Sequence, residues 1–137
     1  MWPNAGLRRY KEAGEQIAGP VRRGRCRGVA VIYSVLIRTL KEGKTVEDFV
    51  NAWMPEKGFG IPTEVVIARG IENPQEVLTL GRSDLAVADI GAFLERVGPQ
   101  ESKRHDKIDA VIDKFVLRSF FEMEGRYDFT NAPQRLE

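Results

Sequence analysis

The chain has 137 residues, of which 42% are hydrophobic and 30% are charged. This length is enough for one domain with its own core, and the sequence lacks the run of roughly 20 apolar residues that a transmembrane helix needs. Cys26 is the single cysteine, so an intramolecular disulfide and a CxxC pair are both excluded. We therefore expect a cytoplasmic protein without a membrane segment, and not a secreted scaffold held by disulfides.

The charge is distributed unevenly along the chain. The formal net charge is +1, but residues 1–28 hold seven of the 21 basic residues and only two of the 20 acidic ones. We expect this arm to contain a short amphipathic helix at residues 5–18 and to dock on protein. Its basic stretch VRRGRCRG has no interleaved aromatic residues, so we do not expect nucleic-acid binding. Residues 29–135 are expected to form one domain.

The first element after the arm is a predicted strand at residues 29–38, VAVIYSVLIR. The segment is rich in β-branched residues, which favour strands. Apolar residues occupy both alternating faces, with Tyr33 on one face and Leu36 on the other. A strand of this kind must be covered on both sides.

A helix and a hairpin are predicted in the middle of the chain. Thr45, followed three residues later by Asp48, resembles a capping box, and the apolar stripe after it ends at Trp53. Residues 63–71 and 76–82 then form two short apolar runs around a turn that contains an Asn-Pro pair. This pattern predicts a β-hairpin.

The last third of the chain predicts two helices and a long strand. Ser83 is positioned to cap the first helix, Gly98 and Pro99 are expected to break it, and the second helix is expected at residues 101–114. Residues 115–129 then alternate between apolar and charged positions, which predicts a strand with one buried face. Because the usual strand has about five or six residues, we expect a bulge, a bend or an extension onto a partner.

The predicted order is strand, helix, strand, strand, helices, strand. This βαββαβ order predicts the α+β class and a ferredoxin-like sandwich, in which an antiparallel sheet carries its helices on one face. The opposite face of the sheet then stays bare. Because the first strand is apolar on both faces, we expect a homodimer in which a second copy covers that face.

Three segments carry a resemblance to a known group. They are VIYSVLIRTLKEGKTVEDFVNAW, PTEVVIARGIENPQEVLTLGRSD and the helix-rich span before the final strand. Together they resemble the dimeric α+β barrel superfamily, which includes antibiotic-biosynthesis-monooxygenase-like domains. The resemblance implies a fold shared by cofactor-free oxygenases, haem-degrading enzymes, isomerase-like enzymes and proteins without known activity, so it does not select one reaction.

Haem degradation is disfavoured, because this chain lacks most of the residues that haem-degrading members of the group share. Haem-degrading members of this group carry an Asn on the first strand, a Trp just after the third and a His on the second helical region. Here the first strand offers Tyr33 and Ser34, and no Trp follows the third strand. Only His105 has a counterpart, so we expect no haem and no other cofactor.

His105 is the candidate general base, since it is the chain's only histidine and its unperturbed pKa lies near neutrality. Its spacing to Ile108 and Ile112 places it on the pocket-facing side of its helix, and Asp109 is positioned to orient it. A surface histidine paired with a carboxylate would show the same pattern. His105 and Asp109 are two ligands short of a metal site, so none is expected.

Tyr33 and Arg82 are the candidate groups that would orient a substrate. Four arginines lie in or at the ends of predicted strands, and one of them could clamp an anionic substrate: Arg38, Arg69, Arg82 and Arg118. The structural alternatives are a core tyrosine and edge-strand arginines that prevent aggregation. The sequence thus suggests an enzyme of the monooxygenase or isomerase type acting on a small aromatic or carbonyl compound. The alternative is a non-catalytic dimeric module that binds ligands or partners.

Overall fold

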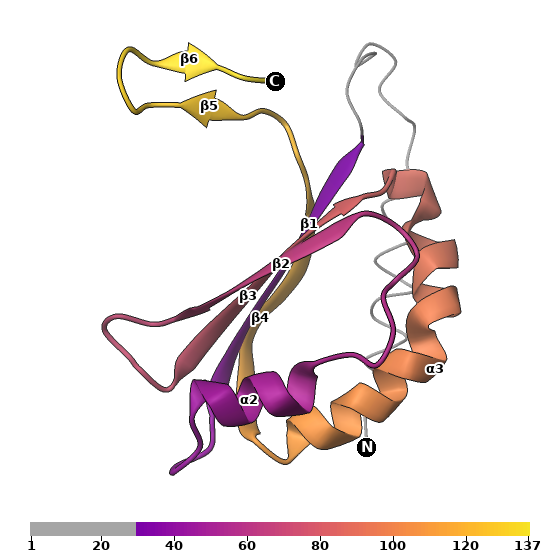
Figure 1. Cartoon of the computed structure of the whole chain (residues 1–137), viewed down its shortest axis with the longest axis vertical. Helices are drawn as coiled ribbons and strands as arrows, with labels where there is room; N and C mark the ends of the chain where they lie inside the picture. The colour runs from indigo at the N-terminus through magenta and orange to yellow at the C-terminus, as the bar shows by residue number, and fades with distance from the viewer. Residues whose placement is uncertain (1–29) are drawn as a thin grey trace.

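The computed structural model describes residues 30–137, which form an α+β fold built on a four-stranded antiparallel sheet. The strands lie in the order β2-β3-β1-β4, and their bounds are β1 Val31–Leu40, β2 Thr63–Arg69, β3 Glu76–Asp84 and β4 Ile112–Glu122. Both helices, α2 (Val46–Trp53) and α3 (Ile90–Asp109), lie on the same side of the sheet (Figure 1). The predicted arm at residues 1–28, with its helix at residues 5–18, lies outside the described residues.

The central strand β1 has two apolar faces, as predicted. Its even-numbered residues face the helices and its odd-numbered residues face away, so that Leu36 and Tyr33 lie on opposite sides of the sheet. Leu36 pairs with Thr79 on β3 and with Arg118 on β4. We call the side that carries Leu36 the inner face and the side that carries Tyr33 the outer face.

Helix α2 begins at the predicted capping box. The backbone N–H of Asp48 donates to Thr45 Oγ1 at 3.1 Å, and the backbone N–H of Thr45 donates to Asp48 Oδ2 at 2.9 Å. The hydrogen bond from the Thr45 backbone N–H lowers the pKa of Asp48, because it stabilises the charged carboxylate. The cap starts the helix at the point where Phe49 enters the core.

The hairpin of β2 and β3 is confirmed, with antiparallel pairing from Thr63 opposite Ser83 to Arg69 opposite Val77. Its turn is closed by the backbone N–H of Glu76, which donates to the Asn73 carbonyl at 3.0 Å. Ser83 lies within β3 and caps no helix, so that prediction is wrong. The turn that leads into α3 is instead a short 3₁₀ helix, η1 (Val87–Asp89).

Helix α3 is continuous through Pro99, so the predicted break at Gly98 and Pro99 is wrong. Proline cannot donate to the carbonyl of residue 95 and normally costs about 3 kcal/mol within a helix. Val97 and Ile108 are buried on either side of the proline, while Pro99 itself is exposed. Packing of the flanking turns therefore holds the helix together, and water can reach the region of the freed carbonyl.

The final strand begins earlier and ends sooner than predicted. Helix α3 ends at Asp109, because Val111 and Ile112 turn into the core and Ile112 begins β4. The expected bulge is present as two register shifts between β1 and β4. After Glu122 the chain forms a separate hairpin of β5 (Tyr127–Asp128) and β6 (Gln134–Arg135), which lies on the side of the sheet away from the helices (Figure 1).

The main hydrophobic core fills one end of the layer between sheet and helices. Its buried members come from β1, α2, β3, α3 and the start of β4: Leu40, Phe49, Val77, Ile108, Val111 and Ile112. Trp53 packs against this cluster, as expected of a residue on the α2 stripe. In residues 30–137, no helix combines the length and apolar character needed to cross a membrane.

Candidate ligand-binding cavity

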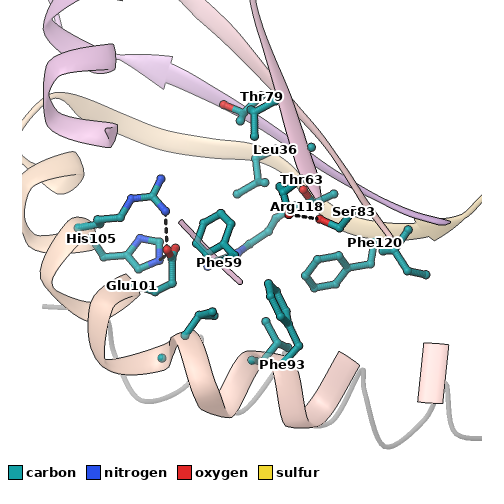
Figure 2. Close-up of a pocket in the computed structure, with 18 of the residues that line it drawn as sticks. Leu36, Phe59, Thr63, Thr79, Ser83, Phe93, Glu101, His105, Arg118 and Phe120 are labelled. Atoms are coloured by element: carbon teal, nitrogen blue, oxygen red, sulfur yellow. Dashed lines mark hydrogen bonds and ion pairs between the residues drawn. The ribbon is translucent and has the colours of Figure 1, made fainter. Parts of the chain in front are cut away.

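A cavity of about 520 Å³ lies between the inner face of the sheet and helix α3 (Figure 2). All four strands of the main sheet contribute to its lining, through residues such as Ser34 on β1, Thr63 on β2, Ser83 on β3 and Phe120 on β4. Its volume falls within the range of about 300 to 1,000 Å³ that is common for small-molecule sites. The cavity continues the layer whose other end is filled by the core.

Two glycines on α3 help to keep the cavity open. The helix presents one stripe to the cavity, with residues three or four positions apart: Gly91, Leu94, Gly98, Glu101, His105 and Ile108. A Cβ atom added at Gly91 or Gly98 would meet no atom within 4 Å. The space beside these glycines is therefore empty, whereas a Cβ at Gly81 on the facing sheet would collide with Ser34 Oγ.

Three phenylalanine rings form much of the apolar wall: Phe59, Phe93 and Phe120 (Figure 2). The rings of Phe59 and Phe93 meet edge to face, with centroids 6.0 Å apart and an interplanar angle of 75°. Phe59 lies in the loop after α2, and Arg96 Nη2 on α3 donates to its carbonyl at 2.7 Å. This contact holds the aromatic wall against the helix.

Two arginines of the sheet reach into the cavity around the ring of Phe115. Arg38 on β1 is only 2% exposed, and its Nη1 donates to Thr79 Oγ1 at 3.1 Å. Its guanidinium lies 5.3 Å from the centre of the Phe115 ring, and that of Arg118 on β4 lies 4.9 Å from the same centre. Cation–π contacts of this kind favour the charged guanidinium where water is partly excluded.

A third arginine, Arg104, joins the two helices. Its Nε donates to the Trp53 carbonyl at 2.7 Å, which satisfies one of the carbonyls left open at the C-terminal end of α2. Its Nη1 forms an ion pair with Glu101, one turn earlier on α3. The lining of the cavity next to α2 is therefore fixed by contacts between side chain and backbone.

His105 lies on the inner side of α3, with 11% of its side chain exposed. Its Nε2 is 3.8 Å from Glu101 Oε2. Burial and, after it, the positive charges of Arg118, Arg38 and Arg104 together lower the pKa of His105 to about 3. Although Glu101 would favour the charged ring, burial and three guanidinium groups outweigh it, so the imidazole is neutral at pH 7.

The structure brings only one of the three predicted site residues into the cavity. His105 lines it, as its helical spacing predicted. Tyr33 and Arg82 pair with each other across β1 and β3 on the outer face, and neither lines the cavity. The alternation of strand side chains places them on the face of the sheet opposite to the one that His105 faces.

Sequence reasoning did not assign the groups that surround the imidazole. Arg38 and Arg118 were recognised as strand arginines, but the sequence did not single them out from Arg69 and Arg82. Arg104 was missed, although its position three residues after Glu101 is a usable signal for an ion pair on a helix.

Across residues 30–137, no three His, Cys, Asp or Glu side chains gather as candidate metal ligands. Comparisons with protein-family models, with curated proteins and with solved structures found no match to this chain. Function is therefore inferred from the cavity and from the residues that line it.

Proposed function

We propose that this protein binds a small aromatic or carbonyl compound in the cavity between the sheet and α3, and that His105 exchanges a proton with the bound compound. One observation carries the proposal: a buried, neutral imidazole opens into a cavity of about 520 Å³ that has aromatic walls. A large pocket that is mostly apolar and holds a few convergent polar groups is the usual form of a small-molecule site.

The chemistry that suits these groups is proton transfer next to a carbonyl. A ring nitrogen of His105 would accept a proton from the carbon beside the carbonyl, and the electrons of the broken C–H bond would move onto the carbonyl oxygen. A guanidinium group of the cavity wall would stabilise that negative charge. Return of the proton to a different carbon would complete an isomerisation with no other reactant.

The second candidate is a non-catalytic ligand-binding module, and the pKa of His105 favours it. Catalytic bases work best when their pKa lies near the working pH. A pKa of about 3 makes the imidazole of the empty cavity a weak base. In this second role His105 would serve as a neutral hydrogen-bonding group.

A ligand screen followed by a turnover assay separates the two candidates. Aromatic ketones, enones and phenols would be screened by thermal shift, and each stabilising compound would be followed by mass spectrometry and by solvent-deuterium incorporation. The enzyme predicts exchange of deuterium into a bound compound, with loss of exchange in His105→Gln. Lys103→Gln is the matched control, because Lys103 is exposed on the same helix and does not line the cavity. Binding without exchange would support the module.

The assembly that we propose is a homodimer of ferredoxin-like sandwiches, paired through their outer faces as a dimeric α+β barrel. The antiparallel order β2-β3-β1-β4 and the helices on one face support the sandwich. The outer face supports pairing, because the part of the chain that the structure describes leaves apolar side chains exposed there: Val66 50%, Leu117 40% and Phe121 49%.

Light scattering tests the dimer. Phe121→Lys would place a charge within the proposed contact and should yield a monomer at micromolar concentration. Ile71→Lys is the control, because Ile71 is 98% exposed at the hairpin turn, away from the face. A wild-type monomer, or equal effects of the two variants, would contradict the proposed pairing.

A further inference from the structure

We propose that the ligand is an aromatic carboxylate, with its carboxylate held between Arg38 and Arg118 and its ring among Phe59, Phe93 and Phe120. This inference rests on the proposed role of the cavity as a ligand site and specifies the chemical class that the site would accept.

The two arginines are placed to act on one group. Leu36 pairs with Arg118 across β1 and β4, and Arg38 is two residues further along β1 on the same face. Residues in this diagonal relation are close enough for long side chains to meet. Both guanidinium groups lie over the ring of Phe115 from their separate strands. Both side chains therefore line the wall formed by β1 and β4, and planar guanidinium groups bind carboxylates well.

The charges along the wall favour an anion. The charged residues among those lining the cavity are three arginines and two glutamates: Arg38, Arg104, Arg118, Glu95 and Glu101. Glu101 forms its ion pair with Arg104, on the α3 side of the cavity. Arg38 and Arg118 belong to the opposite wall, so a ligand that contacts β1 and β4 there would meet two guanidinium groups.

The imidazole of His105 lies in the electrostatic field of the same two arginines. Arg118 and Arg38 are the two charged groups that, after burial, contribute most to lowering the pKa of His105. Their positive charges must therefore act on the space that the imidazole faces. A bound carboxylate would offset those charges and raise the basicity of the imidazole, so ligand binding would bring His105 closer to the range of a working base.

The part of the cavity away from the arginines suits a flat aromatic ring system. The three phenylalanine rings supply faces and edges for contact with an aromatic ring, which prefers stacked or edge-to-face arrangements. The hydroxyl groups of Thr63 and Ser83 lie 3.3 Å apart on the sheet wall, where they can meet a polar substituent. The cavity volume of about 520 Å³ admits a bicyclic compound.

Calorimetric titration of the full chain tests this inference with two probes, 2-naphthoate and 2-acetylnaphthalene. They share one ring system and differ in having a carboxylate or a neutral carbonyl. We expect 2-naphthoate to bind about 10- to 100-fold more tightly, as is typical of hydrogen bonds to charged groups. Arg118→Gln should remove most of that advantage.

Arg135→Gln is the matched control, because Arg135 also lies over an aromatic ring, that of Tyr127, but belongs to the exposed β5–β6 hairpin. It should change the Kd for 2-naphthoate less than twofold. Equal losses in the two variants would overturn the inference, because general electrostatic attraction would then explain the binding. If Arg118→Gln does not fold, the comparison of the two probes on the wild-type protein still shows whether the cavity prefers a carboxylate.

The outcomes also separate this inference from the proposed function. Equal binding of the two probes would overturn the carboxylate preference and leave the ligand cavity standing. Failure of both probes to bind at millimolar concentration would count against the inference and the ligand cavity together. Preference for 2-naphthoate that depends on Arg118 and not on Arg135 would support both.

Discussion

The two ends of the layer between sheet and helices differ in the size of their side chains: large apolar residues fill one end, and glycines border the cavity at the other. At the α2 end, Phe49 and Val77 are completely buried and the space is filled. At the other end, α3 presents Gly91 and Gly98 to the sheet, and the same layer opens into a cavity. A single helix thus contributes Ile108 to the closed core and a stripe of residues, from Gly91 to His105, to the open cavity.

The comparison shows that the packed core at one end of the layer can hold α3 in place beside the cavity at the other end. The core end fixes the register of α3 on the sheet through Ile108, and the contacts of Arg104 tie the helix to α2. Apolar side chains that line the cavity can then stay uncovered without the loss of stability that would unfold the protein. Changes at the two ends should therefore differ in their effects on stability and on binding.

The largest expected effect is the loss of stability in Phe49→Ala. Removal of a fully buried phenylalanine typically costs about 3 to 5 kcal/mol. Phe93→Ala is the matched change at the hollow end, and it should cost less, roughly 1 to 2 kcal/mol, because Phe93 is only partly buried beside existing space. Urea unfolding measures both changes. Equal losses would contradict the contrast between the two ends.

A second effect is the dependence of stability on pH through His105. Its pKa is lowered to about 3 in the folded protein, so the unfolded chain takes up a proton near pH 6.5 and the folded chain does not. The contribution of His105 to stability is complete above pH 6.5 and is lost as the pH falls from 6.5 toward 3. We expect a loss on the order of 1 kcal/mol per pH unit between pH 6 and 5.

His105→Gln should flatten that part of the curve, because His105 is the only histidine in the chain. Urea unfolding at a series of pH values provides the measurement. An unchanged slope in the variant would show that other groups cause the pH dependence.

The smallest effect is a gain in stability from Gly91→Ala. Alanine at an unstrained helical position is about 0.4 to 1 kcal/mol more stable than glycine, and the added methyl group meets no atom of another segment within 4 Å. Gly43→Ala should instead destabilise the protein, because Gly43 has a φ of +80°. Thermal unfolding of both variants checks the signs. Weaker ligand binding in Gly91→Ala would tie the stability gain to a loss of cavity space.

Several local elements could be predicted from sequence because their signals are local. The capping box of Thr45 and Asp48 and the hairpin turn at Asn73 depend on neighbours within a few residues. The continuity of α3 through Pro99 could not be predicted, since it depends on packing of Val97 and Ile108 against distant elements. Tertiary contacts overrode a strong local signal.

The candidate site was predictable only in part for a similar reason. Helical spacing assigned His105 to the buried side of its helix, and the structure agrees. The faces of β1 could not be assigned in the same way, because both are apolar. Nothing in the alternation indicated that the helices cover the face of Arg38 and not the face of Tyr33 and Arg82.

The most direct test of the central claim is the ¹⁵N spectrum of the single imidazole, recorded from pH 7 to pH 4 with and without 2-naphthoate. We predict that free His105 stays neutral down to at least pH 5, since burial and the three arginines lower its pKa to about 3. We also predict that 2-naphthoate shifts both ring nitrogens and raises the pKa. A ring that titrates near pH 6.5 and does not respond to the ligand would contradict a ligand cavity built around His105.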